Sequence, residues 1–246
     1  MSVPNRPVDP LYTCVTPIQY PNQEGHATGF FYVPDEESSE SYLITNHHAV
    51  ANDTGEPLSD SIRILLRPSQ NANQLDFRDI SLGSAADPNW LEHPNGPHVD
   101  VVAIELADID LSDTVNSALH SGLFLPDDVL VNPGEEAMVI GYPFRGSSPY
   151  LPLTRSALIS SPYGSTFQGM PCFATDANMH SGTSGSPVFT LPKPYDQTKD
   201  AIRMGGGGPY FLGIHSATLQ SDHDPDEGPL NINLTWYAEL LRDIIN

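Results

Sequence analysis

Residues 179–189 read MHSGTSGSPVF, in which a serine is flanked by glycines and followed by a strand-like apolar run. Glycine adopts backbone angles that other residues avoid, so a turn around Ser184 can expose a hydroxyl while nearby N–H groups converge on one point. A serine nucleophile needs both features. Glycine-serine loops are also common as plain turns, so other parts of the chain must supply the groups that would activate Ser184.

A serine hydroxyl is a weak nucleophile that needs a base, and the base needs an orienting group. Residues 45–50, TNHHAV, contain two histidines. In an extended chain adjacent side chains point to opposite sides, so only one of His47 and His48 can face a cleft. Asp100 opens the apolar run DVVAIEL, where a carboxylate would need a hydrogen bond such as an imidazole N–H, unless it only caps the strand at the surface.

Short apolar runs separated by turn residues recur along the chain, which predicts a mostly β fold. The expected strands are 27–33, 41–46, 61–67, 99–106, 135–143, 155–161, 186–191, 210–216 and 230–234. Residues 107–134 form a looser connection between two strand groups, and apolar residues at helical spacing predict a helix near 235–246. We expect one all-β domain over residues 1–246, with barrels at about 15–115 and 130–235.

The segments GFFYVPD, YLITNHHAV, DVVAIEL, VIGYP, SGTSGSPVF and FLGIH, in this order, resemble the trypsin-like (chymotrypsin-fold) serine peptidases. The V8-like glutamyl endopeptidases and HtrA-like protease domains of bacteria are the most similar branches. The resemblance runs from about Gly25 to the last helix, and it implies two six-stranded antiparallel barrels and a serine endopeptidase. It makes His48 the base, Asp100 its orienting acid and Ser184 the nucleophile of an acyl-enzyme, with an oxyanion hole at Gly182 and Ser184.

The same resemblance implies a substrate pocket made by Asn178, Met179, His215, Ser216 and Thr218, with a wall near Gly228. The backbone at Ser216 and Thr218 would pair with the substrate as an antiparallel strand. His215 resembles the histidine with which V8-like enzymes bind glutamate, but a core histidine fits the sequence equally well. Asn178 disfavours a preference for Arg or Lys, and Met179 suits a neutral side chain.

Thr183 departs from the pattern of secreted trypsins, which have an aspartate before the nucleophile to receive the new N-terminus after activation. Threonine cannot form that ion pair. The stretch HAV after the predicted base also lacks the cysteine of those enzymes. The resemblance therefore implies no such activation switch in this chain.

The net charge is −21, from 31 acidic and 10 basic residues. Such a surface repels phosphates, which disfavours nucleic acid and anionic membranes as partners. Two interpretations account for this net charge. One is a protein of a salt-rich cytoplasm, where the Debye length is about 3 Å at 1 M salt and the like charges are screened from one another. The other is an ordinary acidic cytosolic protein. The N-terminal residues have no signal-peptide pattern and no long apolar run is present, so we expect a cytoplasmic protein with Cys14 and Cys172 unbridged.

Neither a cofactor nor a metal is expected. The histidines lack a metal-ligand spacing, and the acidic stretch 221–228, SDHDPDEG, has Glu227 where a calcium loop needs glycine. We expect a protein or peptide substrate, and a regulatory protein partner if the specificity is broad. The alternative function is a catalytically silent or latent trypsin-fold binding module that acts through protein partners.

Overall fold

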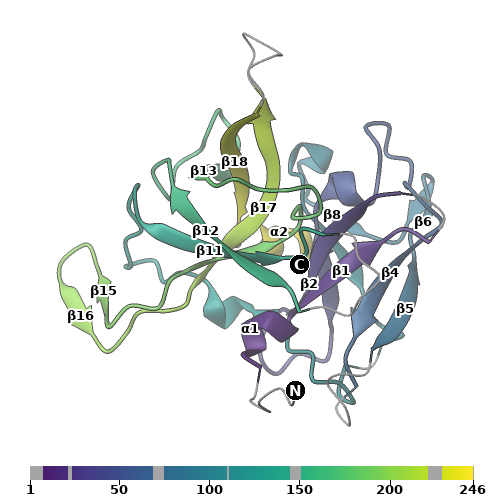
Figure 1. The fold of residues 1–246 in the computed structure, drawn as a ribbon, viewed down its shortest axis with the longest axis horizontal. Helices are drawn as coiled ribbons and strands as arrows, with labels where there is room; N and C mark the ends of the chain where they lie inside the picture. Colours follow the sequence, from purple (N-terminus) through teal and green to yellow (C-terminus); the bar gives the residue numbers. More distant parts are fainter. Residues whose placement is uncertain are drawn as a thin grey trace, which may run out of the picture.

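The computed structural model describes residues 8–21, 24–68, 75–109, 111–144, 151–220 and 229–245. The chain forms two strand groups that lie side by side, with a two-stranded arm extending from the second group (Figure 1). The elements of the first half are α1 Pro10–Thr13, β1 Val15–Gln19, β2 His26–Val33, β3 Tyr42–Thr45, η1 His47–Ala49, β4 Ser61–Leu66, β5 Asp76–Ser81, β6 Gly83–Ser84, β7 Asp87–Pro88, β8 Leu91–Glu92, η2 Gly96–His98, β9 Val102–Glu105, β10 Leu119–His120 and η3 Ser121–Leu123. The elements of the second half are β11 Glu136–Gly141, β12 Leu153–Ile159, β13 Cys172–Asp176, β14 Pro187–Thr190, β15 Tyr195–Gln197, β16 Ile202–Met204, β17 Phe211–Gln220, β18 Pro229–Tyr237 and α2 Leu240–Ile245.

The second strand group is a closed six-stranded barrel in the order β11-β12-β13-β18-β17-β14. The first is a curled sheet in the order β5-β4-β1-β2-β3-β9-β8, with the short β10 pairing in parallel with β2. The predicted all-β class is confirmed. The first sheet differs from the expected six-stranded barrel, because β5 and β8 end the sheet and do not pair with each other among the described residues.

Side-chain alternation in β2 explains how the two halves join. Phe30 and Tyr32 pack into a core cluster shared by both halves, whereas Phe31 packs into the core of the first sheet. The same alternation in β11 sends Ile140 to the shared cluster and Val139 to the core of the closed barrel. Strands of both halves therefore contribute to two cores each, and buried side chains pack continuously across the junction between the halves.

The terminal helix is shorter than predicted. Helix α2 begins at Leu240, and the residues predicted as the start of the helix belong to β18. Trp236 pairs with Cys172 on one side and with Ile214 on the other, so barrel closure takes precedence over the helical spacing there. Cys14 and Cys172 are buried free thiols, as expected, and burial raises the pKa of Cys172 to about 11.

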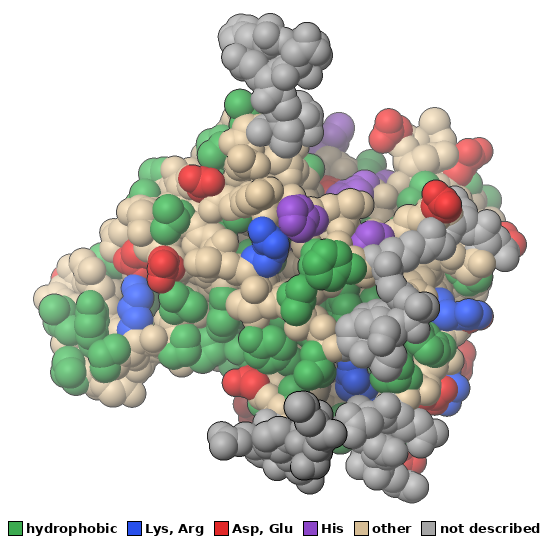
Figure 2. All heavy atoms as spheres, in the orientation of Figure 1, with side chains coloured by type: hydrophobic (Ala, Val, Ile, Leu, Met, Phe, Trp, Pro, Cys, Tyr) green, Lys and Arg blue, Asp and Glu red, His purple; other side chains and the backbone are tan. Residues whose placement is uncertain are grey.

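The stretch 192–209, which the sequence presents as a charged segment and a glycine loop, contains the β15–β16 hairpin (Figure 1). Its outer face is apolar, because Tyr195, Ile202 and Met204 are exposed (Figure 2). Within the part of the chain that the structure describes, no helix has the length and apolar character that crossing a membrane requires.

Candidate active site

His48 and Asp100 meet at the junction of the two halves. The Nδ1 of His48 lies 2.7 Å from Oδ2 of Asp100, and the backbone N–H of His48 donates to Oδ1 at 2.9 Å. Because a carboxylate only accepts hydrogen bonds, Nδ1 carries the proton, and in the neutral imidazole Nε2 is left with a lone pair. Figure 2 shows histidine side chains gathered on the surface at this junction.

Two further contacts hold Asp100 in place. The hydroxyl of Ser216 donates to Oδ2 at 2.5 Å, and the side-chain amide of the buried Asn46 donates to the Asp100 carbonyl at 2.7 Å. Ser216 is predicted as a substrate-binding residue from the sequence. That prediction concerns its backbone; in the structure its side chain orients the carboxylate that orients His48.

The turn that carries Ser184 depends on two glycines in left-handed conformation, Gly182 at φ +93° and Gly185 at φ +87°. A Cβ on Gly182 would lie 2.1 Å from Nε2 of His26, and one on Gly185 would lie 2.0 Å from the carbonyl oxygen of Thr28. Both glycines are therefore required by close packing as well as by backbone angle.

The Ser184 turn is fastened to the first half of the chain through Thr28. The Thr28 N–H donates to the Ser184 carbonyl at 2.9 Å, and its hydroxyl donates to the Gly182 carbonyl at 2.7 Å. The Thr28 carbonyl accepts from the hydroxyl of Thr45, at the end of the strand that leads to His48. These contacts bring the predicted nucleophile and the predicted base to the same junction.

No hydrogen bond joins Ser184 and His48 within the described residues, and the Nε2 of His48 has no partner there. Such bonds are commonly long before substrate binds and tighten in the complex. Likewise, the backbone N–H groups of Gly182 and Ser184 donate to no protein group in the described part of the chain. Both amides thus remain available for a ligand oxygen.

His215 lies beneath the Ser184 turn. Its backbone carbonyl accepts from Gly185 N, and its backbone N–H donates to the Ser186 carbonyl, both at 2.9 Å. The ring Nε2 lies 3.3 Å from the hydroxyl of Thr183, which itself donates to the His180 carbonyl. Burial, together with the nearby His48, lowers the pKa of His215 to about 3, so its imidazole is neutral.

Asn178, Met179 and Thr218 are the other predicted pocket residues. Asn178 is exposed, and Met179 packs partly against the closed barrel's core. The Thr218 hydroxyl donates to the Oδ1 of Asn233, a fully buried side chain whose amide also donates to the Ala177 carbonyl at 2.8 Å. Asn233 therefore connects the segment that contains Thr218 with the one that contains Asn178, and both segments are predicted pocket walls. The residues around Asn233 in the sequence do not indicate this role.

Gly228 and the acidic stretch 221–228 lie outside the described residues. In the part of the chain that is described, no three His, Cys, Asp or Glu side chains are grouped closely enough to hold a metal ion.

His47, the neighbour of the predicted base, is buried in the first half of the chain. Its Nε2 lies 3.4 Å from Oε1 of Glu92, and its ring makes an edge contact with Trp90, whose indole N–H donates to the same carboxylate. The two adjacent histidines are therefore separated, as predicted, but for a different reason: they lie in the 3-10 turn η1, His47–Ala49, and not on an extended strand. Only His48 is exposed at the junction.

We expect any reaction in which His48 serves as a base to depend on pH. Partial burial lowers the pKa of His48, but the hydrogen bond and charge of Asp100 outweigh that effect and raise it above its usual 6.5. A base must be neutral to accept a proton, so kcat/KM should fall as the pH drops through this raised pKa.

In Asp100→Asn the midpoint of the pH dependence of kcat/KM should move to lower pH, because the carboxylate that favours the imidazolium form of His48 is gone. The pH profile of the residual activity measures the shift, and an unchanged midpoint would contradict the coupling.

The fold and this site define a class of protein: a chymotrypsin-fold chain with an imidazole–carboxylate pair beside a glycine-flanked serine. The family model described as trypsin-like peptidase domain matches residues 27–192, which include His48, Asp100 and Ser184. The chain therefore belongs to the trypsin-like peptidase domain family. None of the curated proteins compared with the chain matches its sequence.

Solved structures share the fold at low sequence identity. The apo MamO protease domain from Magnetospirillum magneticum has 14% identity and a TM-score of 0.54, covering 94% of this chain and 95% of that one. The thermostable serine protease AL20 from an extremophilic microorganism has 10% identity and a TM-score of 0.57, covering 96% and 97%. Human heparin binding protein has 14% identity and a TM-score of 0.57, covering 98% and 93%. These likenesses establish the fold alone.

Proposed function

We propose that this chain is a serine endopeptidase in which Ser184, His48 and Asp100 form the catalytic triad. The observation that carries the proposal is the 2.7 Å contact between His48 Nδ1 and Asp100 Oδ2, which leaves the basic Nε2 without a partner among the described residues, at the junction where the Ser184 turn is fastened. If the His48–Asp100 pair had only a structural role, it would not require a nearby serine in a turn that depends on two glycines.

The proposed reaction follows from these atoms. Ser184 Oγ attacks the peptide carbonyl while His48 Nε2 takes its proton, and Asp100 stabilises the resulting imidazolium. The Gly182 and Ser184 amides hold the developing oxyanion. His48 then returns the proton to the leaving amine, and water repeats the sequence to release the acyl group from Ser184.

The specificity that we propose is for a neutral side chain before the scissile bond. His215 is neutral, its Nε2 contacts Thr183, and both of its backbone polar groups hold the Ser184 turn. We therefore assign His215 a structural role: it supports the Ser184 turn and does not bind a substrate carboxylate. Thr218 also has its hydroxyl engaged, by Asn233. Nothing cationic among the described pocket residues remains to pair with glutamate.

Cleavage of a proteome-derived peptide library, read by mass spectrometry at low and high salt, tests both parts of this proposal. We expect cleavage after neutral side chains and little after Glu or Asp. Enrichment of Glu before the cleaved bond would overturn the assignment of His215, and absence of any cleavage would favour the binding-module alternative. Higher activity at high salt would indicate that the charge of −21 is an adaptation to salt.

A further inference from the structure

The curled first sheet leaves two strand edges facing a common space. Leu82 N donates to Asp60 O beyond the end of β5, so in the β4–β5 ladder the backbone groups of Asp79 point away from β4. Leu106 N donates to Ser41 O, so by the same alternation the backbone groups of Glu105 point away from β3. Among the described residues no strand pairs with either of these positions.

A cavity of about 440 Å³ lies between the two edges. Asp79, Ile80 and Ser81 of β5 line one side, and Ala103, Ile104 and Glu105 of β9 line the other. Trp90, a member of the first sheet's core, closes one end. The short β8 pairs with Val102 and Ala103 of β9, so an extended segment placed beyond β8 could hydrogen-bond to Glu105 on one side and to Asp79 on the other.

The two faces of this space differ in chemistry. Ile104 is buried in the core of the first sheet and Ile80 packs against that core, whereas Asp79 and Glu105 are exposed on the outer face. Asp108 adds a further carboxylate to the rim. Asp79 is paired with Arg63, but no ion pair to Glu105 or Asp108 is found in the described part of the chain. Alternate residues of an inserted strand would thus meet an apolar floor and an acidic rim.

We propose that the space between β5 and β9 is a docking site for an extended peptide segment of a separate protein, with apolar residues alternating with Lys or Arg. The carboxylates at the rim favour this occupant because they attract Lys and Arg side chains. A second copy of the chain, which carries the same charge of −21, would be repelled.

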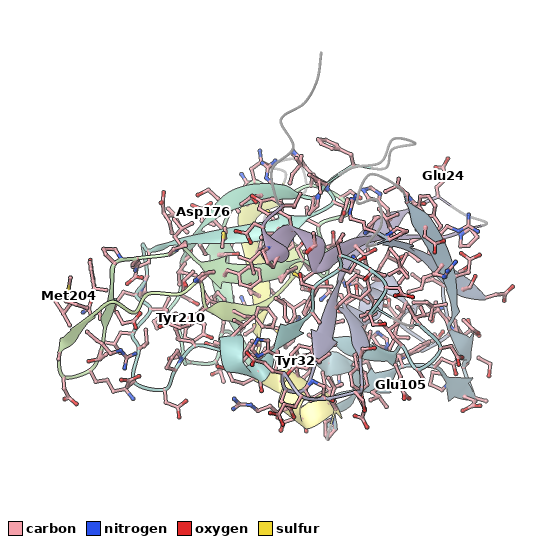
Figure 3. All side chains as sticks on the ribbon, turned by 90° about the horizontal axis from the view of Figure 1, so that it is seen from below. Glu24, Tyr32, Glu105, Asp176, Met204 and Tyr210 are labelled. Carbon is pink, nitrogen blue, oxygen red and sulfur yellow. The ribbon has the colours of Figure 1, made fainter. Side chains whose placement is uncertain are left out.

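The proposed docking site is connected to the proposed active site through β9 and its neighbour β8. Strand β9 begins two residues after Asp100, and β8, which pairs with β9, carries the Glu92 that contacts His47. Glu105, at the proposed docking site, lies in the first half of the molecule, on the opposite side from Met204 of the β15–β16 arm (Figure 3). A bound strand would therefore restrain the segments that hold Asp100 and the His47–His48 turn, and this regulatory consequence rests on the proposed function.

Binding of peptides to full-length Ser184→Ala protein tests the docking site independently of activity. The probes are acetylated, amidated hexapeptides in which Val, Ile or Phe alternates with Lys, and matched peptides with Glu in place of Lys. By isothermal titration we expect one Lys peptide per chain, with the Glu peptides at least tenfold weaker. Glu105→Lys should weaken the Lys peptides at least tenfold, whereas Glu136→Lys, an exposed strand residue of the closed barrel, should not.

Two further measurements locate the contact. N-methylation of alternate residues of the peptide, in either register, should abolish binding because both of its edges are used, and amide exchange should slow at Asp79 and Glu105. The proposal is overturned if no Lys peptide binds at millimolar concentration, or if Glu105→Lys or N-methylation has no effect. A peptide-free dimer that Glu105→Lys dissociates would identify a second copy as the occupant and would equally overturn it.

Discussion

Ser184→Ala is expected to lower kcat/KM on a peptide substrate by about 10⁴-fold or more, because no other group in the proposed mechanism can form the acyl-enzyme. Substrate binding should be nearly unchanged, since Oγ is removed while the backbone contacts of the turn remain. Thr28 N to Ser184 O and Gly185 N to His215 O involve main-chain atoms only. Steady-state kinetics on a peptide from the library measures the loss.

The matched control for this substitution is Ser181→Ala. Ser181 is an exposed serine in the same turn region, and no step of the mechanism uses its hydroxyl. It should retain nearly the wild-type rate. If Ser184→Ala still cleaves at the wild-type rate, or if Ser181→Ala loses as much, the nucleophile has been assigned wrongly.

His48→Ala is expected to cost about 10⁴-fold or more in kcat/KM, because the attacking hydroxyl then has no base and the leaving amine has no acid. His47→Ala should behave differently. It removes the contacts with Trp90 and Glu92, which costs stability of about 1 kcal/mol. We expect the kcat/KM of His47→Ala to fall by less than about tenfold, which corresponds to an increase of less than about 1.4 kcal/mol in the activation free energy.

Comparison of the two histidine variants needs a measure of folding as well as of rate. Thermal unfolding should show a lower Tm for His47→Ala and little change for His48→Ala, whose ring is half exposed. The opposite pairing, with activity lost in His47→Ala and retained in His48→Ala, would show that the base is the other histidine.

Local pattern in the sequence singled out Asp100 at the start of an apolar run and a turn around Ser184 between glycines, whereas the choice of His48 over His47 as the partner of Asp100 rested on the family resemblance. It also predicted that His47 and His48 face different surroundings, although the alternation of an extended chain is not the cause, because both residues lie in the 3-10 turn η1. The strands with buried alternating side chains, such as β2 and β11, followed from the same patterns.

Other features depend on contacts between distant segments, which no local pattern contains. The sequence predicts substrate pairing by the Ser216 backbone, but it does not predict that the Ser216 hydroxyl reaches Asp100, which depends on the return of β17 to the junction. Residues 235–237 have helical spacing, yet barrel closure draws them into β18. Strand β5 is polar and exposed along most of its length, so neither its existence nor the open edge beside it could be predicted from hydrophobic periodicity.

Covalent labelling with a fluorophosphonate tests the central claim most directly, because the reagent traps an activated serine without requiring a known substrate. Intact-mass analysis and peptide mapping of the labelled protein identify the modified residue. The account predicts one label per chain, on Ser184, with labelling lost in Ser184→Ala and strongly slowed in His48→Ala. A folded protein that takes no label, or one whose label persists in Ser184→Ala, would contradict the assignment of Ser184 as the nucleophile of a serine peptidase.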